Sequence, residues 1–209
     1  MKGLFITLEG GDGAGKSTQI RNIERFFDEK DLVVVHTREP GGTAIGEKLR
    51  DILLDKNNSE MDAVTEMLIY AASRAQHVRE FIMPALEEGK VVICDRFVDS
   101  SVAYQAYGRE LGEQVIEVNM RATGGLWPDI TFWLDIDPVT GRNRAGSDGE
   151  LDRLELEQID FHYRVREGYR ALTERYPDRI KRIDASKTVE EMCADIYAYL
   201  EELCRSRGL

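Results

Sequence analysis

Short apolar runs alternate along this chain with longer stretches in which apolar residues recur at helical spacing. The runs lie at residues 4–8, 32–36, 91–94, 130–134 and 180–183. Each run is continuous rather than alternating in polarity, which is typical of a strand buried on both faces of a sheet. Helical spacing is found at 17–30, 44–54, 62–89 with a break, 113–123, 154–175 and 189–207. The alternation predicts an α/β fold, a parallel sheet with helices on both faces.

The segment 141–153 departs from this pattern because it is dense in charge and has no apolar face. It carries Arg142, Arg144 and Arg153 together with three glycines, and we expect it to form a mobile lid. We find no internal repeat and no linker elsewhere in the 209 residues, of which 42% are hydrophobic. One sizeable core suits that length, so we expect a single domain over 1–209.

A glycine-rich loop follows the first apolar run and has the spacing G-x-x-x-x-G-K-[ST]. It consists of Gly10, Gly11, Asp12, Gly13, Ala14, Gly15, Lys16 and Ser17. Glycines let backbone N–H groups wrap a polyphosphate closely, the lysine adds a point charge, and the serine hydroxyl can bind Mg²⁺. The loop therefore predicts a nucleoside triphosphate site, with an ordinary glycine-rich turn as the alternative.

The formal net charge of −11 argues against nucleic acid and membrane surfaces as partners, since a polyanion would be repelled. Three cysteines without C-x-x-C spacing suit a reducing compartment, and we read Cys94 in its apolar run as a buried hydrophobe. No apolar stretch reaches membrane-spanning length. We therefore expect a soluble cytoplasmic protein in which local arginines meet any anionic substrate.

Charged residues cluster where the predicted strands end, which is where ligands bind in open parallel sheets. Asp95 and Arg96 follow the third run. A carboxylate in that position, beside a phosphate-binding loop, can hold Mg²⁺, whereas Arg96 can clamp a phosphate. The alternative is an Asp–Arg pair that caps the strand.

A second anionic substrate would need further cations, and the chain offers Arg38, Arg50, Arg74 and Arg96 on different elements. Arg50 could equally be a surface residue of a helix. Tyr70 precedes Arg74 by one helical turn, so a ring and a guanidinium share one face, as stacking on and bonding to a nucleobase would require. The alternative places Tyr70 simply in the core.

The segment 95–105, DRFVDSSVAYQ, resembles the signature of the thymidylate kinase family. Further motifs match that family in order and spacing along nearly the whole chain. They are REPGGT at 38–43, YAASRAQH at 70–77, GELDR at 149–153 and DAS at 184–186. The resemblance implies a P-loop nucleoside monophosphate kinase fold with strand order 2-3-1-4-5, a homodimer, and phosphoryl transfer from Mg·ATP to dTMP.

The resemblance also implies roles for individual residues on the acceptor side. Tyr70 would stack on thymine, Arg74 would bond a ring carbonyl, and Ser101 would face the ring N–H, with Gln105 in the same pocket. Arg50 and Arg96 would hold the dTMP phosphate with Arg38 nearby. Tyr104 would crowd the position of a ribose 2′-hydroxyl.

On the donor side, Asp12 and Glu9 would lie beside the reacting phosphates and the metal, which Ser17 and Asp95 also approach. Thr18 continues the phosphate-binding loop, and the segment 184–187, with Ala185 and Lys187, would shape the adenine pocket. Lys16, Asp12 and Arg96 are therefore the expected catalytic residues outside the lid.

Gly13 stands where eukaryotic-type family members carry an arginine in the phosphate-binding loop, so the lid must supply the transition-state cation. The family's bacterial form often has several arginines just before GELDR, whereas this chain has Ala145-Gly146-Ser147-Asp148. We therefore expect Arg153 to be catalytic, with Arg144 as the second choice. The alternative functions are a kinase for another nucleoside monophosphate or a deoxynucleoside, a P-loop switch, and an inactive nucleotide-binding module.

Overall fold

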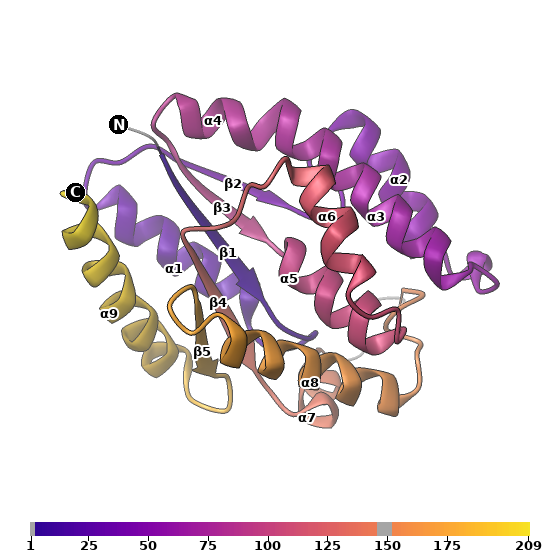
Figure 1. Ribbon diagram of the computed structural model, residues 1–209. Coiled ribbons are helices and arrows are strands. Elements are labelled where there is room, and N and C mark those ends of the chain that lie inside the picture. The colour runs from indigo at the N-terminus through magenta and orange to yellow at the C-terminus, as the bar shows by residue number, and fades with distance from the viewer. Residues whose placement is uncertain (1–2, 146–151) are drawn as a thin grey trace.

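The computed structural model describes residues 3–145 and 152–209, and its centre is a parallel sheet of five strands (Figure 1). The strands are β1 (Leu4–Glu9), β2 (Val34–Arg38), β3 (Val91–Asp95), β4 (Ile130–Asp135) and β5 (Ile180–Asp184). Every neighbouring pair is parallel, and the order is β2-β3-β1-β4-β5. The predicted fold class and strand order are confirmed.

Burial differs between the inner and the outer strands. All six residues of β1 and all six of β4 are buried. The hydroxyls of Thr7 in β1 and Thr131 in β4 form a hydrogen bond of 2.7 Å. The edge strands β2 and β5 are only partly buried, so the expectation of complete burial was wrong for them. Strand β2 begins at Val34, two residues later than the apolar run, and Val33 just before it is 62% exposed.

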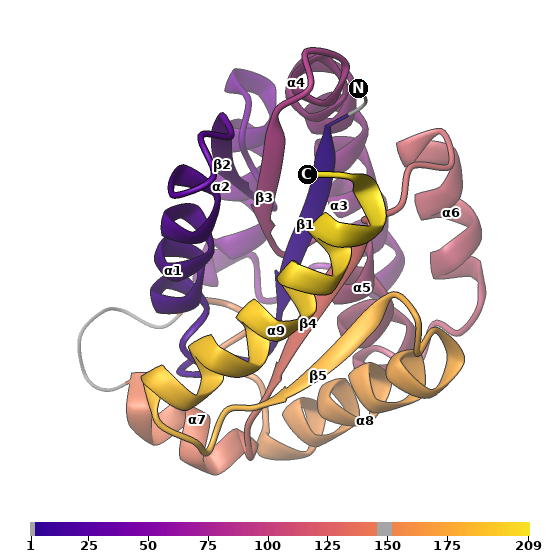
Figure 2. The ribbon, with the colours of Figure 1, turned by 90° about the vertical axis from the view of Figure 1, so that its left-hand side faces the viewer.

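Helices cover both faces of the sheet (Figure 2). One face packs against α1 (Lys16–Asp28) and α9 (Val189–Arg207) through a core cluster that includes Ile23, Phe27 and Ile196. The other face carries α3 (Ala63–His77), α6 (Gln114–Thr123) and α8 (Ile159–Arg175), with α2 (Ala44–Leu54) packed on α3. A single 3₁₀ turn, η1 (Lys56–Asn58), follows α2. In the described residues, no helix is long and apolar enough to span a membrane.

Among the described residues, two helical segments contain a stretch of π-helix. The break expected within 62–89 is the π segment η2 (Val78–Ile82), which joins α3 to α4 (Met83–Glu87). After β3, the short helix α5 (Val98–Ser101) continues into a second π segment, η3 (Val102–Gly108). Sequence periodicity did not predict α5 or η3. Such widened turns are frequent at functional sites, and η3 contains Tyr104 and Gln105.

The structure describes both ends of the expected lid. Residues 141–145 complete the helix α7 (Pro138–Ala145), which the periodicity did not predict. At the other end, the Asp152 carboxylate accepts the backbone N–H groups of Leu154 and Glu155 at 2.8 and 2.9 Å, so a turn replaces helix and α8 begins only at Ile159. These ends therefore have regular local structure, and the mobility of the lid stays a prediction. Gly146, Gly149 and their neighbours within 146–151 lie outside the described residues.

Candidate active site

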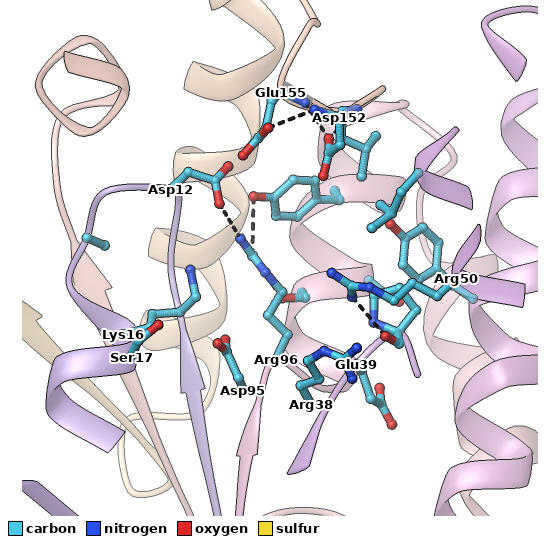
Figure 3. A pocket seen from close by; sticks show the side chains of 18 of the residues that line it. Asp12, Lys16, Ser17, Arg38, Glu39, Arg50, Asp95, Arg96, Asp152 and Glu155 are labelled. Carbon is cyan, nitrogen blue, oxygen red and sulfur yellow. Dashed lines mark hydrogen bonds and ion pairs between the residues drawn. The ribbon is translucent and has the colours of Figure 1, made fainter. Parts of the chain in front are cut away.

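A cavity of about 480 Å³ opens at the carboxyl ends of β1, β2 and β3 (Figure 3). Loop residues 12–18 form one wall, and residues of α2, α3 and η3 form the other. The cavity brings together every residue predicted for the acceptor side: Arg38, Arg50, Tyr70, Arg74, Arg96, Ser101, Tyr104 and Gln105. The cavity thus has a phosphate-binding wall and a facing wall that carries several cations and an aromatic ring.

The glycine-rich loop adopts a conformation that few other residues could take. Gly10, Gly13 and Gly15 have φ angles of 138°, 71° and 92°, in the region that L side chains rarely adopt. Gly15 precedes α1 and provides no side-chain cap, so N–H groups of the first turn are left to bind a ligand. The Lys16 Nζ donates to the carbonyls of Gly10 and Gly11 at 3.1 and 3.2 Å. Burial, aided by nearby Arg96, lowers the pKa of Lys16.

Helix α7 rests directly on this loop. A Cβ atom at Gly13 would lie 2.0 Å from the Gly141 carbonyl oxygen, and one at Gly141 would lie 2.6 Å from the Asp12 carbonyl oxygen. Because both obstructing atoms are backbone, neither position has room for a side chain. An arginine at position 13 is therefore excluded by packing, and any additional cation has to come from elsewhere.

Arg96 lies at the centre of the cavity. Its Nη2 donates to Asp12 at 3.1 Å, its Nη1 donates to Tyr104 at 3.3 Å, and its guanidinium stacks over the Tyr104 ring at 5.2 Å. Its backbone φ of 68° is unusual for a residue with a side chain. Burial opposes ionisation of Asp12, but Arg96 and Lys16 outweigh it and lower the Asp12 pKa. Arg96 is thus a fixed cation between the loop and η3.

Asp95, at the end of β3, has a carboxylate oxygen to which no described residue donates a hydrogen bond. Its Oδ1 is buried and has no hydrogen-bond partner among the described residues. Asp95 and Ser17 line the same cavity, both near Lys16 (Figure 3). A buried carboxylate oxygen without a donor is unfavourable unless a cation or a donor completes it. Asp95 and Ser17 together therefore suit a hard divalent cation, which binds oxygen ligands.

Glu9 lies behind the cavity rather than in it. Its carboxylate accepts the Phe97 N–H at 2.8 Å, the Ser100 hydroxyl at 2.5 Å and the Tyr169 hydroxyl at 3.1 Å. Burial, together with nearby Asp99, raises the pKa of Glu9 to about 7. With its oxygens already occupied, Glu9 supports the loop after β3, and the structure does not favour its expected role as a metal ligand.

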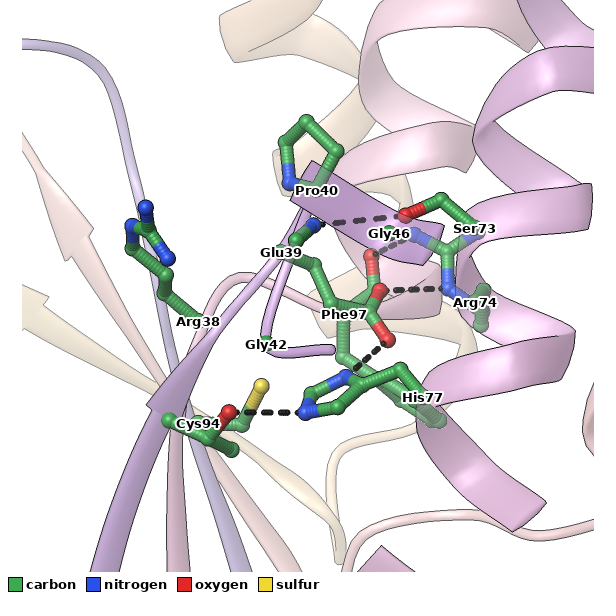
Figure 4. A network of polar contacts seen from close by, with 12 residues as sticks. Arg38, Glu39, Pro40, Gly42, Gly46, Ser73, Arg74, His77, Cys94 and Phe97 are labelled. Atoms are coloured by element: carbon green, nitrogen blue, oxygen red, sulfur yellow. Dashed lines mark hydrogen bonds and ion pairs between the residues drawn. The ribbon is translucent and has the colours of Figure 1, made fainter. Parts of the chain in front are cut away.

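Arg74 is held at the far end of the cavity by a buried network (Figure 4). Its Nε donates to Glu39 at 2.7 Å, its Nη2 donates to the Phe97 carbonyl at 3.0 Å, and its Nη1 donates to Ser101 at 2.8 Å and also to Asn119. Four of its five N–H groups are therefore used inside the protein. One N–H remains for a ligand in the cavity that Arg74 lines.

The supports of Arg74 were missed by sequence reasoning. Glu39 also accepts from His77 at 3.0 Å, and His77 bonds the Thr37 hydroxyl at 2.7 Å. Glu39 and His77 occur in two of the quoted motifs, 38–43 and 70–77, but nothing in their local spacing indicated that they meet. His77 is fully buried.

The two remaining acceptor-side arginines differ in their partners and in their position relative to the cavity. Arg50 donates to the Pro40 carbonyl at 2.9 Å and extends into the cavity (Figure 3). Arg38 makes two bonds to the Glu47 carboxylate at 2.9 and 3.0 Å, and its side chain is 46% exposed. The structure therefore places Arg50 in the site and Arg38 at its rim.

The lid arginines lie in three different environments. Arg153 is 6% exposed, pairs with Glu66 at 2.7 Å and donates to the Leu53 carbonyl at 2.9 Å. It is not among the described residues that line the cavity. Arg144 donates to the Ala185 carbonyl at 2.7 Å, beside the expected adenine pocket, whereas Arg142 donates to the Glu155 and Glu157 carbonyls.

The expected adenine segment lies beyond β5. Lys187 pairs there with Asp195 at 2.6 Å on the surface, and Ala185 is fully buried. Neither residue is among those lining the described cavity. The contact from Arg144 joins this segment to the end of α7.

Comparison with known proteins agrees with this geometry. The model of the family described as thymidylate kinase matches residues 8–196. The thymidylate kinase of Clostridium novyi is 49% identical over 203 residues, which cover 96% of this chain and 99% of that protein. A thymidylate kinase from a Geobacillus strain is 50% identical over 197 residues, which cover 93% of this chain and 94% of that protein. The crystal structure of thymidylate kinase from Ehrlichia chaffeensis superposes with a TM-score of 0.78 at 31% identity, over 96% of this chain and 100% of that one. The chain therefore belongs to the thymidylate kinase family.

Proposed function

We propose that this protein transfers the terminal phosphoryl group of ATP to dTMP and forms dTDP. The observation that carries the proposal is one cavity in which a glycine-rich loop faces a second set of cations and the buried guanidinium of Arg74. A P-loop switch would need only the first wall. Family membership favours dTMP over another monophosphate or a nucleoside as the acceptor.

The reaction needs alignment and charge neutralisation more than covalent help from the protein. The attacking atom is a phosphate oxygen of dTMP that is already ionised at neutral pH, so no general base is required. Lys16 neutralises the outer phosphates of ATP, while Arg96 and Arg50 hold the dTMP phosphate opposite them. Asp12 keeps Arg96 oriented through the contact at 3.1 Å.

Mg²⁺ fits this site because Asp95 offers an orphaned buried oxygen and Ser17 a hydroxyl on the loop. We propose that these two residues hold the ion, Asp95 directly or through water. When bound, Mg²⁺ supplies charge neutralisation for the phosphates. Glu9 then acts from behind by fixing the backbone after β3.

The deoxynucleoside is placed along α3 and η3. Tyr70 stacks on the base, and the free N–H of Arg74 bonds a ring carbonyl. Tyr104, with its hydroxyl bound to Arg96, presents its ring to the sugar. A 2′-hydroxyl would be rejected there by crowding.

An acceptor panel tests the proposal. ADP formation is measured with dTMP, dUMP, dCMP, CMP, AMP, thymidine and the 2′-hydroxyl analogue of dTMP. We expect dTMP to give the highest kcat/KM, and Tyr104→Ala to raise turnover of the 2′-hydroxyl analogue relative to dTMP. ATP hydrolysis without any dependence on an acceptor would contradict a kinase, and an unchanged ratio in Tyr104→Ala would remove that residue from sugar selection.

Replacing Arg74 by alanine is expected to weaken dTMP selectively. The charge-assisted bond to the base contributes on the order of 1.5–3 kcal/mol, so the KM for dTMP should rise by roughly tenfold or more. ATP binds on the opposite wall, and its KM should stay within about twofold. Steady-state kinetics with each substrate varied in turn make the comparison. An equal loss for both substrates would show a general folding defect instead.

We further propose that the protein is a homodimer. Helices α2 and α3 lie side by side and expose four large apolar side chains, Ile45, Ile52, Val64 and Leu68, each between 40% and 51% exposed. A second copy packed on these helices would cover them. Light scattering of the purified chain is expected to give twice the mass of one chain, and a monomeric mass would contradict this assignment.

A further inference from the structure

The side-chain amide of Gln105 has its orientation fixed by a buried carboxylate. Gln105 is 1% exposed, and its Nε2 donates to Glu66 Oε1 at 2.9 Å. A carboxylate oxygen can only accept, so the NH₂ group of the amide must face Glu66 and the carbonyl must face the other way. The chemistry of Glu66 thus decides which end of the Gln105 amide is turned toward the cavity.

Glu66 is itself ionised and held firmly. It is fully buried, and its Oε2 pairs with Arg109 at 3.0 Å and with Arg153 at 2.7 Å. Burial opposes its ionisation, but bonds from Arg109 and Gln105 and the charge of Arg153 outweigh that effect and lower the pKa of Glu66. The two arginines therefore occupy one oxygen, and the other oxygen is left to Gln105 and to a longer contact from Arg109 Nε at 3.3 Å.

The opposite end of the amide has no partner. Gln105 Oε1 is buried without a hydrogen bond among the described residues, and Gln105 lines the same cavity as Arg74. A buried acceptor without a donor is costly, so it marks the position of a donor on the ligand. Arg74 contributes the complementary feature, an N–H that no described residue uses. The cavity wall thus offers one acceptor and one donor.

We propose that Glu66 is a positioning residue that fixes the Gln105 amide as an acceptor and so selects a pyrimidine that carries an N–H in its ring. Thymine and uracil have a ring N–H, which matches the acceptor of Gln105, beside a carbonyl, which matches the donor of Arg74. This assigns the ring N–H to Gln105 in place of Ser101, whose hydroxyl accepts from Arg74 at 2.8 Å. Cytosine has a ring nitrogen lone pair beside an amino group and mismatches both. The inference rests on the proposed function, because it requires the base of the acceptor to occupy this end of the cavity.

The fold places these groups on one wall. Glu66, Tyr70 and Arg74 follow one another at intervals of four residues on α3, so they share one face of that helix. Gln105 reaches the same face from η3, where the widened helix lies across from α3. The proposed stacking residue Tyr70 therefore stands between the group that positions Gln105 and the guanidinium that binds the carbonyl.

Glu66→Gln tests the proposal. The new amide is expected to turn its oxygen to Arg109 and Arg153 and its NH₂ to Gln105, which then turns its own NH₂ toward the base. The ratio of kcat/KM for dCMP over dTMP should rise by roughly tenfold or more, with the loss for dTMP lying mainly in KM. The ratio for dUMP over dTMP should stay within about twofold, because both bases carry the ring N–H.

Arg109→Gln is the matched control. It removes a cation from the same carboxylate but leaves the bond between Glu66 and Gln105 in place. Its thermal stability should fall, while its dCMP over dTMP ratio should stay within about twofold of the parent. If Glu66→Gln does not fold, the double variant E66Q/R109Q removes opposite charges together and carries the same test.

A folded Glu66→Gln protein with the parental base ratio would overturn the proposal, as would an Arg109→Gln protein whose ratio changes equally. Calorimetric binding of dTMP and dCMP without ATP should reproduce the change in preference and separates binding from turnover. Failure of the unaltered protein to phosphorylate dTMP would instead defeat the proposed function itself.

Discussion

Replacing Lys16 by alanine is expected to lower kcat by about 10²-fold or more while the fold stays intact. Lys16 Nζ lies in the loop, 3.1 and 3.2 Å from two of its carbonyls, at the N-terminus of α1. Removal of a positioned group that neutralises developing charge has an effect of this order. Coupled detection of ADP with saturating dTMP gives kcat, and circular dichroism with a thermal melt reports the fold.

Lys30→Ala is the matched control for Lys16→Ala. Lys30 follows the other end of α1, where it pairs with Glu201 on the surface at 3.2 Å. It should retain the parental kcat, because surface pairs contribute little to stability and this one lies far from the loop along the helix. A folded Lys16→Ala protein with activity within about threefold of the parent would remove the loop as the ATP site.

Alanine at Arg144 is expected to lower kcat by about 10²-fold with little change in equilibrium ATP affinity, since its charge should act chiefly in the transition state. We propose Arg144 ahead of Arg153 because Arg144 binds only a backbone carbonyl among the described residues, whereas Arg153 is held by Glu66 in the protein interior. Removal of Arg153 would leave a buried carboxylate short of one cation. Arg153→Ala should therefore lose about 3–5 kcal/mol of stability before any effect on chemistry is seen.

Single alanine variants of Arg142, Arg144 and Arg153 separate these roles. Each is measured for kcat, for equilibrium ATP binding and for the midpoint of thermal unfolding. A large fall in kcat for Arg153→Ala at parental stability would restore that residue as the catalytic one. Near-parental kcat in all three would place the catalytic cation outside 142–153, among the cations that line the cavity, such as Arg96.

Structural features that depend on a continuous stretch of sequence could be predicted. The phosphate-binding loop, the five strands and the bounds of α2 and α9 are indicated by the spacing of residues that are close to each other in the sequence. These features depend mainly on effects between residues that are close in sequence. The effects are the backbone freedom of glycine, the burial of an apolar run and the amphipathicity of a helix. The motif at 95–105 was recognised for the same reason, and six of its residues line one cavity: Asp95, Arg96, Ser100, Ser101, Tyr104 and Gln105.

Edge strands and helix starts were less predictable. Strand β2 begins with two valines as the inner strand β3 does, and only the sheet order shows that β2 has one open edge. In β5, by contrast, Lys181 and Arg182 stand between the two isoleucines. Helix α8 begins later than its periodicity suggests, because the Asp152 carboxylate caps a turn before it. The π segment η3 has no periodic signature, although it carries two residues of the site.

The fold class, the glycine-rich loop and the acceptor-side residues that line the cavity could all be read from the sequence and its motifs. The packing of the elements was needed to show which charged residues face the cavity and which are buried partners of others. Glu9, Glu39, Glu66 and Arg153 look like any other charged residues in the sequence, yet each is buried with partners that lie tens of residues away. A charge can be buried only where opposite charges or donors converge on it, and that convergence is a property of packing between elements, which local spacing does not encode.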